Sequence, residues 1–255
     1  MKTELILAIP HSSTHIVNDG TIEKTMFPGV QRDALLCADL YTDFLFDYPD
    51  AKKIICPVSR MMVDVERFLD KEKEEMASFN RGAFYKVLND GKTIFRKNIN
   101  IDLLDIYVQY HKELSEAVEL VKEKNKEPFI IDCHSFNEQP FCFDKHKDIK
   151  DIYGRYKDIK DIEDRKVDFC FGYNNKKDIP KNVFAKIRKW AAGHCFSYNF
   201  NVPYSGSITT DTCTRSLMIE VNKRIYLEED NITPNSYMNI LQLEISKLLD
   251  SIKED

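Results

Sequence analysis

The chain has 255 residues, 43% hydrophobic and 31% charged, a composition typical of a soluble globular protein with a sizeable core. Its 37 basic and 42 acidic residues give a formal net charge of -5, so we expect no general attraction to nucleic acid or to an anionic membrane. The sequence contains no apolar run of the roughly 18 residues that a membrane span needs. Its short apolar start predicts a strand rather than a secretion signal, so we expect a cytoplasmic protein.

Patterns typical of strands and helices alternate along the chain. The apolar run 5–9 ends at Pro10 and predicts a buried strand. Helical spacing of apolar residues predicts amphipathic helices at 32–46, 102–124, 180–193 and 234–253. Further strands are predicted at 53–58, 129–132 and 216–221, and we expect 61–67 to continue extended. This alternation predicts one α/β domain over 1–255, with a mixed, mostly parallel central sheet flanked by helices.

One segment departs from this alternation. Between 147 and 162 the hexapeptide Lys-Asp-Ile-Lys-Asp-Ile occurs twice. Two copies are too few for a solenoid, so we interpret 145–165 as a charged surface insertion, with a substrate-gating lid as the alternative.

The seven cysteines are scattered at 37, 56, 133, 142, 170, 195 and 213, without a C-x-x-C pair. An odd and scattered set argues against a disulfide framework and against a thiolate zinc site.

Polar residues stand at the carboxyl ends of three predicted strands, in 10–13, 132–135 and 219–222. Loops at these ends converge on ligands in open α/β sheets. Two histidines, His11 and His134, together with Glu220, suit a zinc hydrolase, in which a carboxylate takes the proton from an activated water. Because strand side chains alternate between faces, we expect neither Asp132 nor Cys133 to pair with His134.

Five segments in a fixed order resemble the N-formylglutamate amidohydrolase family. They are Pro10-His11-Ser12, the stretch from Ser59 to Arg67 (SRMMVDVER), Asp132-Cys133-His134-Ser135, the stretch from Asn201 to Gly206 (NVPYSG) and the stretch from Met218 to Tyr226 (MIEVNKRIY). Four positions depart from the family pattern: Ser13 and Ser207 replace glycines, Met218 replaces a glutamine and Glu66 replaces an asparagine. We expect Glu66 to repel a substrate anion unless it is protonated or paired.

The resemblance implies a phosphorylase/hydrolase-like α/β fold, related to the zinc carboxypeptidases and aspartoacylase. It also implies zinc-assisted hydrolysis of the N-acyl amide of an acidic amino acid such as N-formylglutamate, a small-molecule substrate of histidine catabolism. The implied metal ligands are His11 and His134. Asp64 is the candidate third ligand, or else it orients His11 from outside the coordination sphere.

Further roles follow from the same resemblance. Glu220 is the expected general base, with an ion pair to Lys223 or Arg224 as the alternative. Arg60 and Arg67 are expected to bind the substrate carboxylate or to polarise the scissile carbonyl, and Asn201 and Tyr204 to line the pocket. A His-and-carboxylate site also accepts divalent metals other than zinc.

Three other functions remain open at this point. A thiol or serine hydrolase would use Cys133 or Ser135 as its nucleophile, provided that a base lies beside it. A relative without catalytic activity would act only by binding. A zinc carboxypeptidase-like enzyme would act on peptides. His111, on the predicted helix 102–124, is interpreted as a packing residue.

Overall fold

The computed structural model describes residues 2–138 and 164–254, and the repeated hexapeptide at 147–162 lies outside them. A six-stranded sheet has the order β2-β1-β3-β6-β4-β5. Its strands are β1 (Thr3–Ile9), β2 (Lys52–Ile55), β3 (Glu127–Phe136), β4 (Phe169–Gly172), β5 (Tyr198–Phe200) and β6 (Ser216–Asn222). The first four strands in this order are parallel, β4 is antiparallel to β6, and β5 runs parallel to β4. The predicted α/β fold with a mixed, mostly parallel sheet is confirmed.

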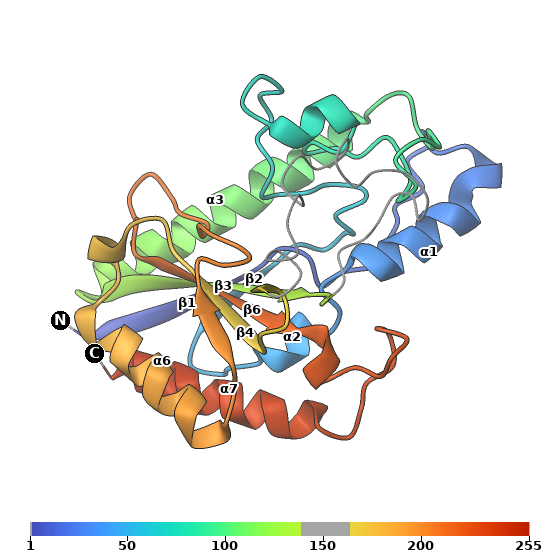
Figure 1. Cartoon of the computed structure of the whole chain (residues 1–255). Helices are drawn as coiled ribbons and strands as arrows, with labels where there is room; N and C mark the ends of the chain where they lie inside the picture. Colours follow the sequence, from blue (N-terminus) through green and yellow to red (C-terminus); the bar gives the residue numbers. More distant parts are fainter. Residues whose placement is uncertain (1, 139–163, 255) are drawn as a thin grey trace.

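Helices cover both faces of the sheet (Figure 1). Within the described residues the α-helices are α1 (Phe27–Cys37), α2 (Thr42–Leu45), α3 (Ile101–Glu123), α6 (Lys181–His194) and α7 (Met238–Lys253), of which α3, α6 and α7 lie along the sheet. Along β1, Leu5, Leu7 and Ile9 pack into the core that α6 and α7 share. Ile6 and Ala8 point the other way, into the core beneath α3. A strand buried on both faces reads as a continuous apolar run, which is how β1 could be predicted.

The predicted helix at 32–46 is interrupted. α1 ends at Cys37, the backbone of Ala38 is extended, and Tyr41 adopts the left-handed conformation with a φ of 63° before α2 begins. The amide of Asp39 donates to the carbonyl of His11 (2.9 Å) instead of continuing the helix. A tertiary hydrogen bond thus overrides the helical spacing of the sequence.

Two further expectations about secondary structure were inaccurate, and two strands were not predicted. Residues 61–67 are not a strand, because the amides of Met62 and Val63 turn back to the carbonyl of Ser59 (2.7 and 3.1 Å). Strand β3 does not stop at Asp132 but continues to Phe136, and it is paired with β6 from Ile130 onward. β4 and β5 were not predicted, since runs of four and three residues are too short to show a period.

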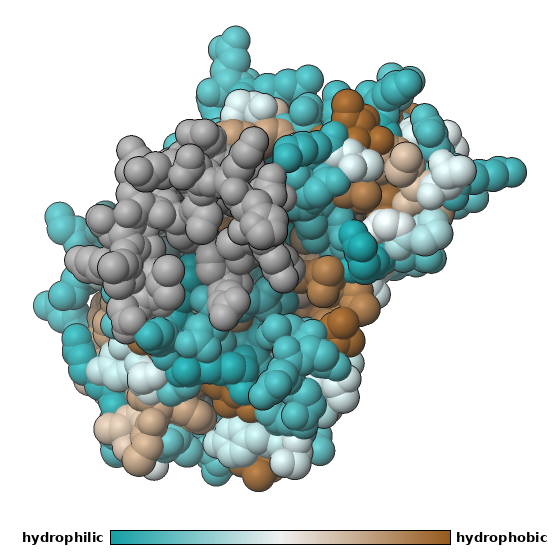
Figure 2. All heavy atoms as spheres, turned by 45° about the vertical axis from the view of Figure 1, so that its right-hand side comes forward, coloured by the Kyte–Doolittle hydropathy of each residue, from teal (hydrophilic) through white to brown (hydrophobic). Residues whose placement is uncertain are grey.

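Hydrophilic residues cover much of the face seen in Figure 2, where hydrophobic residues surface in separate patches. Within residues 2–138 and 164–254, no helix combines the length and apolarity that crossing a membrane requires. The six cysteines in these ranges are free thiols.

Candidate active site

Two histidines meet at the carboxyl end of the sheet. His11 follows the last residue of β1 by two positions, and His134 lies in β3, which pairs with β1. Their ring centroids are 5.2 Å apart, and both side chains are buried. Adjacent parallel strands deliver their following side chains to one edge of the sheet. The structure thereby brings together the two residues that we expect to bind the metal.

A buried aspartate holds one nitrogen of each imidazole. His11 Nε2 lies 2.9 Å from Asp64 Oδ1, and His134 Nδ1 lies 3.0 Å from Asp39 Oδ2. Metal-ligating histidines are commonly oriented by such a carboxylate on the nitrogen that does not bind the ion. His11 Nδ1 and His134 Nε2 are the ring nitrogens that these two contacts do not use.

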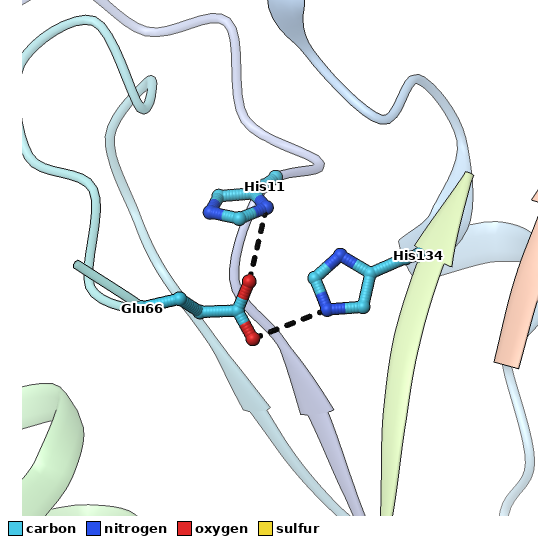
Figure 3. Close-up of side chains that lie close together, drawn as sticks. All are labelled: His11, Glu66 and His134. Atoms are coloured by element: carbon cyan, nitrogen blue, oxygen red, sulfur yellow. Dashed lines mark hydrogen bonds and ion pairs between the residues drawn. The ribbon is translucent and has the colours of Figure 1, made fainter. Parts of the chain in front are cut away.

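Glu66 is the carboxylate that these two nitrogens share (Figure 3). Its Oε1 lies 3.2 Å from His134 Nε2 and its Oε2 lies 3.6 Å from His11 Nδ1. The potential ligand atoms of His11, Glu66 and His134 all lie within 4.8 Å of one another. Burial raises the pKa of Glu66, but the two histidines outweigh burial and lower that pKa to about 2. Glu66 is therefore an ionised carboxylate turned toward the imidazoles.

Sequence reasoning missed this role of Glu66. It treated the residue only as a departure from the family pattern that would repel an anion. The replacement of asparagine by glutamate was the signal that could have revealed it, because a carboxylate ligates a divalent metal far better than an asparagine amide does.

Asp64 lies behind His11 rather than between the two imidazoles. Besides His11, it accepts hydrogen bonds from Arg60 (Nη2 to Oδ2, 2.8 Å) and from the Tyr85 hydroxyl (3.1 Å). The side chain is fully buried. Although burial opposes ionisation, the neighbouring Arg60 and His11 hold the pKa of Asp64 well below its usual range. Of the two roles considered for Asp64, the contacts correspond to orienting His11.

Asp39 flanks the histidine pair on the other side. Its Oδ2 lies 3.6 Å from His11 Nδ1 in addition to the contact with His134. The break between α1 and α2 places Asp39 here, and sequence reasoning missed it by counting the residue within a continuous helix. An aspartate on the apolar side of a helical pattern was the signal that could have revealed it.

The expectation that Asp132 does not pair with His134 was wrong. Asp132 Oδ1 lies 2.9 Å from His134 Nε2, because residues two apart in a strand project from the same face. Cys133, between them, points to the opposite face as expected and packs in the core with α6 and α7. Burial raises the pKa of the Cys133 thiol well above its ordinary value, which argues against a thiolate nucleophile.

Glu220 lies beside His134 in the register of β3 and β6. Its side chain is buried, and Oε2 has no hydrogen-bond partner among residues 2–138 and 164–254. Burial raises the pKa of Glu220 to about 8, although His134 opposes the rise. The alternative ion pairs are not formed: Lys223 donates to the carbonyl of Ala38 (2.6 Å), and Arg224 pairs with Asp168 (2.8 Å).

The two arginines predicted to bind the substrate differ in how closely they already contact carboxylates of the protein. Arg60 directs both Nε and Nη2 at Asp64 Oδ2 (3.2 and 2.8 Å). Among the described residues, the side chain of Arg67 makes longer contacts, to Asp64 (3.7 Å) and to Glu74 (3.4 Å), and 34% of it is exposed. Arg67 is the guanidinium better placed to bind a further carboxylate.

The two predicted pocket residues contact different groups. Asn201 occupies a left-handed turn with a φ of 56°, and its side chain accepts from the Tyr173 amide (2.8 Å). The Tyr204 hydroxyl accepts from Arg165 (2.8 Å), and its carbonyl accepts from the thiol of Cys170, the β4 residue opposite Glu220. Tyr204 thus lies against the strand beside Glu220, whereas the contact of Asn201 shapes the turn.

Comparisons with known proteins agree with this architecture. The chain is similar to N-formylglutamate amidohydrolase from Ralstonia eutropha JMP134, with a TM-score of 0.74, 18% identity and coverage of 98% of this chain and 92% of that one. It is also similar to a gene product of Agrobacterium tumefaciens, with a TM-score of 0.56, 15% identity and coverage of 98% and 92%. At these identities the likeness concerns the fold. No curated protein matches the chain.

The family comparison covers most of the sequence. The sequence model of the N-formylglutamate amidohydrolase family (FGase) matches residues 3–227. This range includes the histidine pair, the carboxylates around it and both arginines. The chain therefore belongs to the N-formylglutamate amidohydrolase family, whose members are hydrolases of carbon–nitrogen bonds other than peptide bonds.

Proposed function

We propose that the protein is a metal-dependent amidohydrolase that removes the acyl group from an N-acyl acidic amino acid, with N-formylglutamate as the first candidate. Family membership supports the reaction class, and the name of the Ralstonia eutropha neighbour supports the candidate substrate. The observation that carries the proposal is the carboxylate of Glu66 between His11 and His134.

The donor set fits a divalent cation, with zinc as the first candidate. Two imidazole nitrogens and one carboxylate oxygen form a ligand set typical of catalytic zinc. His11 Nδ1 is buried without a hydrogen-bond partner among the described residues, an orphaned lone pair that an ion would satisfy. Asp64 and Asp39 hold the opposite ring nitrogens. Bound at these residues, such an ion would supply a Lewis acid for the amide carbonyl and for water.

Glu220 is the proposed proton carrier. In the hydrolysis the water oxygen bonds to the acyl carbon, the carbon–nitrogen bond breaks, and the leaving amine takes up a proton. The Oε2 atom of Glu220 is unpartnered and adjacent to His134, so it can accept the proton of water and return it to the amine. A pKa near 8 lies close to the working pH, where a group can both accept and donate.

Arg67 is the proposed partner of the substrate side-chain or α-carboxylate. The repulsion that we expected from Glu66 is relieved, because both of its oxygens face imidazoles rather than the arginine. A guanidinium with free donors binds a carboxylate through parallel hydrogen bonds. The contacts of Arg60 favour a supporting role instead, since it fixes Asp64.

A side-by-side assay tests the proposal. The purified protein, loaded with zinc, is given N-formylglutamate, N-acetylaspartate and short peptides, and the released amine is measured. We expect release from an N-acyl acidic amino acid, and release about 10²–10⁴-fold slower from the same chain carrying Glu220→Gln. Release from peptides alone would replace the proposal with a carboxypeptidase-like activity. Zinc binding without release from any of the three would favour a binding protein.

A further inference from the structure

The long helix α3 presents two side chains to the segment that carries Glu66. Tyr107 and His111 lie four residues apart and so share one face of the helix. Their rings are in contact, with centroids 4.5 Å apart. Both side chains are partly buried, and neither is used by the mechanism above.

Each of the two side chains bonds a backbone carbonyl next to Glu66. His111 Nε2 lies 2.8 Å from the carbonyl oxygen of Val65, and the Tyr107 hydroxyl donates to the carbonyl of Arg67 (3.0 Å). A carbonyl only accepts hydrogen bonds, so Nε2 of His111 must carry the proton. The peptide unit that precedes Glu66 and the one that follows Arg67 are therefore attached to α3.

This attachment matters because Glu66 lies outside any helix or strand. Within its own segment, the Glu66 amide has only a long hydrogen bond to Asp64 Oδ1 (3.3 Å), and the Arg67 amide donates to the Asp64 carbonyl (3.2 Å). The Glu66 side chain remains 24% exposed. A glutamate with several rotatable bonds on an irregular segment loses considerable conformational entropy when it is fixed between two imidazoles. Hydrogen bonds to the carbonyls of the residues before and after Glu66 reduce that cost by ordering the backbone in advance.

We propose that Tyr107 and His111 are positioning residues that hold the Glu66 carboxylate at the histidine pair and thereby set the affinity of the metal centre. The inference rests on the proposed metal centre. Neither residue is proposed as a metal ligand, an acid or a base, because both side chains contact backbone carbonyls.

The test compares zinc affinities, measured by competition with a chromophoric chelator. His111→Phe removes the donor but keeps an aromatic ring against Tyr107, whereas His111→Gln keeps a donor at similar reach. Ser115→Ala is the control on the same helix, since the Ser115 hydroxyl donates to the helix carbonyl of His111 (2.9 Å) rather than to the segment that carries Glu66. Loss of residues that orient ligands typically weakens metal binding about 10–100-fold. We expect about a tenfold weakening for His111→Phe and for Tyr107→Phe, and near-normal affinity for His111→Gln and the control.

A double-mutant cycle separates positioning from general destabilisation. In a Glu66→Ala background, His111→Phe should weaken zinc binding no further, because the carboxylate it positions is gone. An undiminished effect in that background, or equal losses for His111→Gln and His111→Phe, would overturn the proposal. If Glu66→Ala and His111→Phe both leave zinc affinity unchanged while His134→Ala abolishes it, the positioning role fails but a histidine-based centre stands. A wild-type chain that binds no zinc would reject the metal centre and this inference together.

Discussion

Glu66 and Asp39 face the same two imidazoles, yet they differ in exposure and in what holds them. The Glu66 side chain is 24% exposed, whereas that of Asp39 is 6% exposed. A catalytic metal site keeps one coordination position open to substrate. The more open carboxylate therefore fits the third ligand, and the enclosed one fits the role of orienting His134.

This difference predicts unequal effects of two isosteric substitutions. Glu66→Gln should weaken zinc binding more than 100-fold, because it removes the charged ligand. Asp39→Asn should weaken it by only about 10–100-fold, as for a carboxylate that orients a ligating histidine. Equilibrium dialysis of both variants measures the ranking. The reverse order would move Asp39 into the coordination sphere and Glu66 outside it.

Glu220 allows a sharper test of the mechanism. Glu220→Gln keeps the size and polarity of the side chain but removes the base. General base catalysis is typically worth about 10²–10⁴-fold, so kcat should fall by that order while KM and zinc content stay close to wild type. Steady-state kinetics with metal analysis measures all three. Loss of zinc together with activity would instead make Glu220 a ligand, and an unchanged kcat would remove it from the mechanism.

Among the elements of the fold, those that were predictable from sequence are the ones whose pattern is local. β1 is a continuous apolar run, and α3 shows apolar residues at helical spacing. The prediction of α3 was accurate to within one residue at each end. The interruption between α1 and α2 could not be predicted, because its cause is a hydrogen bond from Asp39 to the distant carbonyl of His11. The turns at 59–67 are closed by local hydrogen bonds, but they are also held by distant partners: the Ser59 amide donates to the carbonyl of His15 and the Asp64 amide to that of Ala83 (both 2.8 Å).

The same division applies to the candidate site. His11, His134 and Glu220 stand on or next to apolar strands, so their convergence followed from the rule that the carboxyl ends of parallel strands meet. Glu66 and Asp39 lie on irregular backbone between elements. Their side chains are aimed by tertiary contacts that no local pattern records.

Arg96 makes tertiary contacts of this kind, and they fix the irregular segment that leads to Asp64. The side chain is fully buried. It donates to the carbonyls of Met61 (3.2 Å) and Met62 (2.8 Å) from Nη2, and to that of Tyr85 (2.6 Å) from Nε. Because Tyr85 in turn donates to Asp64, Arg96 supports the outer partner of His11 through two routes.

Removing this arginine should destabilise the whole fold. Arg96→Met keeps much of the side-chain volume but leaves three buried carbonyls without their donor, and each unsatisfied buried group costs about 1–3 kcal/mol. We expect a loss of about 3 kcal/mol or more in the free energy of unfolding, measured by urea denaturation. Lys97→Met, on the exposed neighbouring residue, is the control. Equal stability of the two variants would show that the carbonyls find other partners.

Over the whole molecule, the candidate centre joins segments that are far apart in the sequence. His11 follows β1, Asp39 lies between α1 and α2, Glu66 follows β2, and His134 and Glu220 come from β3 and β6. These groups meet only when the sheet is formed and the connecting segments are packed on it. An ion bound by them is therefore bound by the native state and far less by the unfolded chain, so its binding free energy adds to folding stability.

Zinc should accordingly raise the melting temperature in a concentration-dependent way. At about 100 times the dissociation constant, a ligand specific for the native state stabilises it by about 2.7 kcal/mol. For a chain of this size about 1 kcal/mol corresponds to about 2–4 °C, so calorimetry should show a rise of about 5–10 °C that a chelator reverses. Magnesium should give little shift, because it prefers all-oxygen octahedral coordination over imidazole. His134→Ala should abolish the zinc effect. A zinc shift that survives in His134→Ala would locate the bound ion elsewhere on the protein. A shift lost in both His134→Ala and Glu66→Ala would show that the stabilisation by zinc requires these two side chains.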